Sequence, residues 1–118
     1  MILNDIKGAL ESVDPRVFYG AAEDLESGDL WNYIVFWRDI MRTAAGKTGY
    51  TDQFTVGIVR EEFVPDEDVD AVIGAMLAIP GIKLSGSEFP YEYARKPNTS
   101  NVCEMLMLKF VRARKTDV

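Results

Sequence analysis

The stretch of residues 52–82 constrains the fold most, because a strand, an acidic turn and a helix follow one another in it. The alternating apolar side chains of residues 53–59 predict a strand with one apolar face. After the acidic turn, apolar side chains at helical spacing predict a helix over about residues 66–79, which Pro80 and Gly81 end. A helix that follows a strand so closely has to pack back on that strand's apolar face. The stretch therefore predicts the core of an α+β domain.

Patterns on either side of this stretch predict further helices and strands. Apolar spacing over residues 2–13 predicts an N-terminal helix, which Asp14 and Pro15 end because the residue before proline avoids the α conformation. Other patterns predict strands at 17–19, 30–40, 82–84 and 102–112, an extended edge at 89–96, an exposed acidic loop at 21–29 and a hairpin tip at 41–52. We predict a single α+β domain over residues 1–118. Its sheet, mixed or mainly antiparallel, would have about 4–5 strands packed against two helices.

Two of the predicted strands are apolar on both faces. In one, Trp31, Tyr33, Val35 and Trp37 alternate with Ile34 and Phe36; in the other, Leu106, Leu108 and Phe110 alternate with Cys103, Met105, Met107, Lys109 and Val111. A sheet that faces water on one side needs only one apolar side per strand. For the strand at 30–40, the second apolar side indicates either a central strand covered on both sides or contact with another chain. For the strand at 102–112, it indicates either burial under the N-terminal helix or self-association, and the pattern leaves these explanations open.

The charges are unevenly distributed along the chain. Residues 1–70 hold 15 acidic and 6 basic side chains, a net charge of −9, whereas residues 71–118 hold 4 acidic and 7 basic ones, a net charge of +3. The total of −6 argues against a protein that wraps nucleic acid over most of its surface. The asymmetry fits either chance combined with helix capping or a subunit whose acidic patch meets a neighbour's basic patch.

The composition excludes several kinds of reactive site. The chain has no histidine and one cysteine, Cys103, so a disulfide within the chain, a Cys/His metal site and a Ser–His or Cys–His nucleophile are all excluded. We expect Cys103 to be a buried thiol. The N-terminus has no basic region before an apolar run, and no apolar run approaches the roughly 20 residues of a membrane helix. We therefore expect a soluble intracellular protein without a cofactor.

Three weak patterns suggest chemistry. Residues 45–48 (AGKT) match the end of a phosphate-binding loop, but Met41 occupies the position of its first glycine. The carboxylates Asp39, Glu61, Glu62 and Asp66 could bind Mg²⁺ if the fold gathered them, and Arg38, Arg42, Lys47 and Tyr50 could contact phosphate. The acidic residues 66–68 suit the first turn of a helix, which favours negative charge, so we predict helix capping there and no metal site.

The order of the predicted elements resembles a known family. It is similar to that of the tail terminators of long-tailed bacteriophages, the minor tail protein U type, and the related tail-completion proteins. The resemblance spans the N-terminal helix into VFYG, the acidic loop before LWNYIVFW, the segment DQFTVGIVREEFVPDEDVDAVIGAML, and the paired segments FPYEYARK and VCEMLMLKFVRARK. It implies a small subunit without enzymatic activity or cofactor, which forms a ring, commonly a hexamer. Such a ring caps the finished tail tube and joins it to the head.

The implied partners are copies of the chain itself, the tail-tube protein and the head–tail connector protein. The protein would act in the virion tail or neck after assembly in the host cytoplasm, away from membranes, with nucleic acid only passing through the ring. We expect the interfaces to include Trp31, Tyr33, Trp37, Arg42, Lys47, Tyr50, Met105, Met107 and Lys109. The alternatives are another head–tail connector protein of the neck and, in a different class, a small Mg²⁺-dependent nuclease or nucleotide-binding enzyme.

Overall fold

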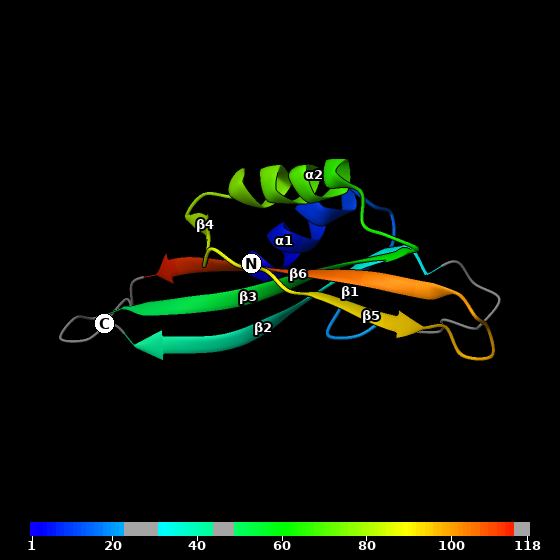
Figure 1. Cartoon of the computed structure of the whole chain (residues 1–118). Coiled ribbons are helices and arrows are strands. Elements are labelled where there is room, and N and C mark those ends of the chain that lie inside the picture. Colours follow the sequence, from blue (N-terminus) through cyan, green and yellow to red (C-terminus); the bar gives the residue numbers. More distant parts are fainter. Residues whose placement is uncertain (23–30, 44–48, 115–118) are drawn as a thin grey trace.

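A computed structural model describes residues 1–22, 31–43 and 49–114 of the chain. Its helices and strands are α1 (Ile2–Glu11), β1 (Val17–Tyr19), β2 (Tyr33–Thr43), β3 (Tyr50–Glu61), α2 (Asp66–Leu77), β4 (Ile82–Leu84), β5 (Tyr91–Arg95) and β6 (Val102–Arg114). The three long strands β2, β3 and β6 run side by side along the length of the molecule (Figure 1). The chain is elongated, with extents of 53 × 25 × 24 Å.

The strands form one mixed sheet in the order β1-β2-β3-β6-β4, with β5 also paired to β6. The pair β1–β2 is parallel and the other pairs are antiparallel. The predicted α+β class with a mixed sheet is therefore confirmed. The strand number was predicted too low, because β6 is long enough to pair with β5 along its first half and with β4 along its second half.

The predicted hairpin that joins the two strands is confirmed by the antiparallel pairing of β2 with β3, but its tip is shorter than the predicted residues 41–52. Met41, Arg42 and Thr43 continue β2 and pair with the first residues of β3. Conversely, the predicted strand at 30–40 begins only at Tyr33. Residues 44–48 of the tip and 23–30 of the predicted acidic loop lie outside the described residues.

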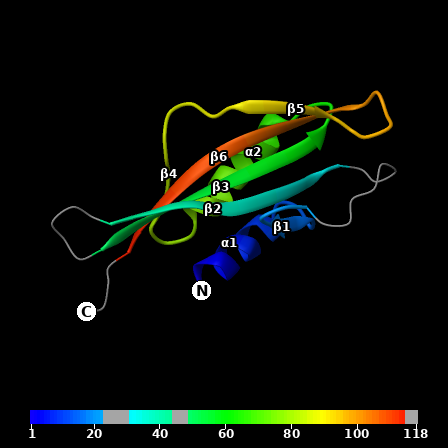
Figure 2. The same cartoon turned by 90° about the horizontal axis from the view of Figure 1, so that it is seen from below.

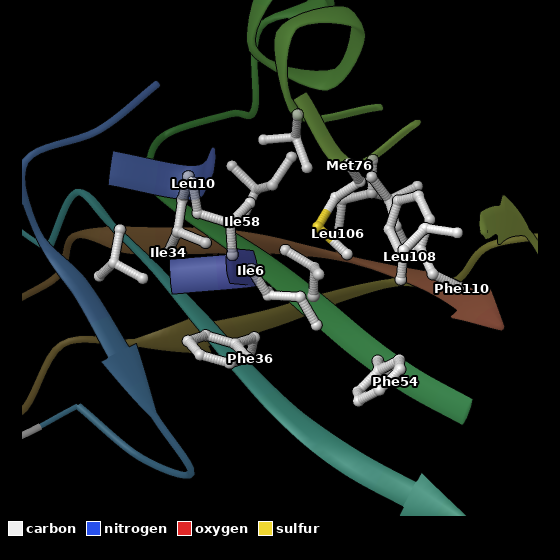
Figure 3. Close-up of a cluster of buried hydrophobic side chains, with 14 of the residues drawn as sticks. Ile6, Leu10, Ile34, Phe36, Phe54, Ile58, Met76, Leu106, Leu108 and Phe110 are labelled. Atoms are coloured by element: carbon white, nitrogen blue, oxygen red, sulfur yellow. The ribbon is translucent and has the colours of Figure 1, made fainter. Parts of the chain in front are cut away.

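Both helices pack on the same face of the sheet (Figure 1). Ile6 and Leu10 of α1 and Val72 and Met76 of α2 are fully buried. They join Phe54, Val56 and Ile58 of β3 and the alternate side chains of β2 and β6 in one core cluster (Figure 3). The predicted packing of the second helix on the apolar face of its preceding strand is confirmed. Seen from below, the sheet lies in front of α2, so its other face carries neither helix (Figure 2).

Candidate functional site: the helix-free face of the sheet

Strand alternation decides which side chains lie on the face opposite the helices. Leu106, Leu108 and Phe110 of β6 belong to the core, so their neighbours in sequence point the other way. The strand register aligns these side chains in rows across the sheet. The helix-free face consists of Tyr33, Val35 and Trp37 of β2, Thr55, Gly57 and Val59 of β3, and Met105, Met107 and Lys109 of β6.

The helix-free face is largely apolar. Val35 and Val59 are buried, although no helix lies over them, whereas Trp37, Met105 and Met107 are half-buried. Side chains on the face therefore cover one another. At its centre, a Cβ on Gly57 would lie 3.2 Å from Met105 Sδ and 3.2 Å from Val35 Cγ1, so these two neighbours close over the glycine. The result is a continuous surface of aromatic and methionine side chains.

A hollow of about 220 Å³ opens at one end of this face. Trp31 and Tyr33 line it together with Met105 and Cys103. Burial, and then the charge of Glu61, raises the pKa of the Cys103 thiol, which is therefore protonated at neutral pH and a poor nucleophile. The prediction of a buried thiol is confirmed, since Cys103 is 3% exposed.

A polar cluster around Asp39 lies at the other end of the face. A register shift between Arg38 and Ile40 marks a β-bulge there. The Asp39 carboxylate accepts hydrogen bonds from Trp37 Nε1 at 2.9 Å, from Gln53 Nε2 at 3.3 Å and from Thr55 Oγ1, and Lys109 Nζ lies 3.7 Å away. The cluster therefore fixes the orientation of the Trp37 indole on the sheet surface.

The charge of Asp39 is stabilised by these neighbours. Burial by itself would raise the pKa of Asp39, but the hydrogen bonds from Thr55, Gln53 and Trp37 and the charge of Lys109 together lower it. The carboxylate is thus ionised at neutral pH, and side chains of the same sheet face already serve as its hydrogen-bond partners. These bonds make it a structural group.

The structure brings together most of the predicted interface residues. Trp31, Tyr33, Trp37, Arg42, Met105, Met107 and Lys109 lie on or beside the helix-free face. Tyr50 does not: its ring lies under Arg114, 4.8 Å from the guanidinium carbon, at the end of the opposite face. Lys47 lies outside the described residues. The helices bury only one face of the two strands that are apolar on both sides. The helix-free face is not covered by a helix.

The residues proposed for metal or phosphate chemistry are not gathered. Asp39 bonds to Thr55, whereas Glu61 lies six residues further along the same strand, roughly 20 Å away at about 3.3 Å per residue. Glu61 instead pairs with Lys96 Nζ at 3.3 Å. Among the described residues there is no group of His, Cys, Asp or Glu that could hold a metal ion. The AGKT segment at 45–48 lies outside the described residues.

The sequence patterns missed two features on the helix side of the sheet. One is Phe63, whose ring is 60% exposed in the turn between β3 and α2. The other is a hollow at the far end of the sheet that Arg112, Arg114 and Asp52 line. A single exposed aromatic in a turn and arginines at a strand end carry no periodic signal, so only the folded chain reveals them.

Comparisons with known proteins add no family. No protein-family model matches the chain, and no curated protein matches it either. None of the helices in residues 1–22, 31–43 and 49–114 has the length and apolar character needed to cross a membrane.

Proposed function

We propose that this chain is a structural subunit of a bacteriophage tail, which forms a ring that caps the tail tube and joins it to the head. The observation that carries the proposal is the continuous apolar face of the sheet that neither helix covers. The free energy falls when another protein covers such an apolar surface and removes it from water. The order of helices and strands, which resembles that of tail terminators, suggests the type of assembly.

The composition of the helix-free face suits protein contact. Tryptophan, tyrosine and methionine are enriched at the centres of protein interfaces, and charged groups are depleted there. Trp37, Met105 and Met107 are side chains of the enriched types. The charge of Lys109 on the same face is partly balanced by Asp39. Trp37 is also held in place before binding, which reduces the entropy lost on association.

We assign this face to the tail-tube protein. The face runs along the long strands, so one subunit presents an extended surface to a single partner. In a ring, neighbouring copies require two further surfaces that differ from each other. The ends of the elongated molecule remain for those contacts.

Tube polymerisation in vitro tests the proposal. Purified chain added to polymerising tail-tube protein of the same phage should stop growth and co-sediment with the tubes. The double variant Trp37→Glu with Met107→Glu should bind at least about 30-fold more weakly, because it places two carboxylates in the buried interface. Leu77→Glu is the matched control, since Leu77 is 46% exposed on α2. That variant should behave as wild type.

The outcomes separate the candidate functions. Tubes that grow unhindered, with no chain in the pellet, would refute the assignment to a tail terminator. Binding to the connector protein without binding to the tube would identify another neck protein instead. Equal binding by the double variant and wild type would show that the helix-free face is not the contact.

A further inference from the structure

The hollow on the helix side of the sheet, at the end where β3 begins, combines apolar walls with positive charge. It measures about 270 Å³, and its lining includes Met1, Ile2, Arg38, Arg112, Arg114 and Asp52. For comparison, a cavity of about 150 Å³ is large enough to hold a benzene ring. We call this hollow the arginine socket.

Positive charge in the arginine socket exceeds the negative charge. Arg112 Nη2 lies 3.1 Å and Arg114 Nε 2.8 Å from the same oxygen of Asp52. The described lining residues thus include three guanidinium groups and one carboxylate. In addition, Arg112 Nε is buried and has no hydrogen-bond partner. The socket therefore favours a ligand that adds an acidic group.

The opposite end of β3 carries a protruding aromatic residue beside an acidic one. Glu62 has a φ of 74°, which is uncommon for a residue other than glycine, and Phe63 is 60% exposed. The Glu62 N–H donates to the Val102 carbonyl at 2.9 Å, and the Val64 N–H donates to Glu104 Oε1 at 2.8 Å. These bonds to β6 hold the turn in place. We call Glu62 and Phe63 the knob.

The knob and the arginine socket lie at opposite ends of the molecule. Asp52 of the socket and Glu61, which precedes the knob, are nine residues apart on one strand, roughly 30 Å at about 3.3 Å per residue. The turn at the knob leads into α2, and the socket lies beside the start of α1, so both are on the helix side of the sheet. One molecule therefore cannot fill its own socket.

We infer that the knob of one copy of this chain binds in the arginine socket of the next copy, head to tail. The Phe63 ring would lie against the Met1 and Ile2 side chains, and the Glu62 carboxylate would pair with Arg114. The partner is a second copy because the chain itself carries both complementary surfaces, an acidic aromatic knob and a basic apolar hollow. The contact is heterologous, so each copy binds two neighbours, and successive copies close into a ring or extend as a filament.

This inference deepens the proposed function by naming the contact between subunits of the ring, and it rests on the proposal that the chain assembles with itself. It leaves the helix-free face available for the tail tube. The lining of the arginine socket does not include Trp37 or Met107, so the variants of the two surfaces change different residues.

Light scattering coupled to size-exclusion chromatography tests the contact with two variants. The knob variant is Glu62→Gly with Phe63→Ser, in which glycine suits the positive φ and the second change removes an exposed ring. The socket variant is Arg38→Glu with Arg114→Glu, at two exposed positions. Controls that change the net charge in the same directions are Glu11→Lys for the knob variant and Lys83→Glu for the socket variant, both at exposed positions. Circular dichroism confirms that each variant is folded.

The mass of wild type should rise with concentration from 13.3 kDa to multiples of it, and the two controls should behave alike. Each variant alone should associate at least about 30-fold more weakly, the loss expected for a central interface residue, about 2 kcal/mol. An equimolar mixture of the two variants should form a dimer and nothing larger, because one intact knob meets one intact socket. A contact between two identical surfaces would not be restored by mixing.

Any of three results would overturn the inference. Wild type could remain a monomer at its highest soluble concentration, either variant alone could assemble like wild type, or the mixture of the two variants could stay monomeric. The proposed function fails separately, when the chain does not stop tube growth. Loss of tube termination in the helix-free-face variant alone, with self-association intact, would confirm that the two surfaces act independently.

Discussion

At the scale of single residues, Asp39 shows how one position can organise a surface. Its carboxylate lies beside the bulge in β2, accepts hydrogen bonds from three side-chain donors and is 3.7 Å from the ammonium of Lys109. Trp37 is held by one of these bonds, at 2.9 Å. Alternation from Tyr33, Val35 and Trp37 already assigns Asp39 to the helix-free face. Its partners on β3 and β6 depend instead on the register between strands.

We predict that Asp39→Asn lowers the free energy of unfolding at pH 7 by about 1.5–3 kcal/mol, the range for hydrogen bonds to a charged group. Because folding lowers the pKa of Asp39, its charge contributes stability above its unfolded pKa of about 3.9. That contribution is lost as the pH falls through the folded pKa. Urea denaturation at pH 7 and at pH 3 should therefore show the difference between wild type and variant shrinking in acid.

The exposed carboxylate of Asp70 on α2 provides the control for this prediction. Asp70→Asn should leave the free energy of unfolding nearly unchanged at both pH values. A difference for Asp39→Asn that stays equal from pH 7 to pH 3 would contradict the role assigned to its charge.

At the scale of helices and strands, Arg60 joins three elements. Its guanidinium lies 3.0 Å from Asp14, which follows α1, and 2.9 Å from Asp68 in the first turn of α2. It also donates to the backbone carbonyls of Tyr33 and Val59. One side chain of β3 thus fixes one end of each helix to the sheet.

We predict that Arg60→Ala lowers the free energy of unfolding by about 3 kcal/mol, because it leaves two carboxylates without their partner in a partly buried site. Arg60→Lys should have a free energy of unfolding between those of Arg60→Ala and wild type, since an ammonium keeps the charge but not the planar set of donors. Arg95→Ala, at an exposed position of β5, should change stability by less than about 0.5 kcal/mol. Urea denaturation measures the free energy of unfolding of all three variants, from the shift of the midpoint at an unchanged denaturant slope. A loss of less than about 1 kcal/mol for Arg60→Ala would show that the helices are held by packing alone.

At the scale of the whole molecule, the protein has two layers instead of three. The helices cover one face of the sheet, and the other face is left to side chains that cover one another. Met107 and Leu108 are adjacent in sequence, but one is half-buried on the helix-free face and the other is buried in the core. The core under the helices therefore stabilises the fold, while the opposite face of the sheet is not covered by a helix.

We predict opposite outcomes for a carboxylate at these two neighbouring positions. Leu108→Glu buries an unpaired charge in the core and should prevent folding or cost more than about 4 kcal/mol. Met107→Glu should cost about 1 kcal/mol and remain folded, because its carboxylate reaches water. Circular dichroism with urea denaturation distinguishes the two. Unfolding by both substitutions would mean that the helix-free face is itself a buried core.

The sequence by itself determined the local elements and their class. Strand alternation around Phe54, helical spacing up to Met76 and the ends set by proline and glycine all depend on neighbours a few residues apart. It also indicated that β2 and β6 carry apolar residues on both faces, which holds in the structure. Most of the helix-free face could be predicted in this way, because alternation assigns each side chain to one of two faces.

The tertiary structure alone decided which of the two faces the helices cover and which remains open. It also decided that β4 and β5 share one side of β6, that Asp39 meets Gln53, Thr55 and Lys109 of the neighbouring strands, and that Phe63 and Arg112 lie at opposite ends of the molecule. The physical reason is the same in each case. These arrangements depend on the register between segments far apart in the chain, and periodicity within one segment carries no information about register with another.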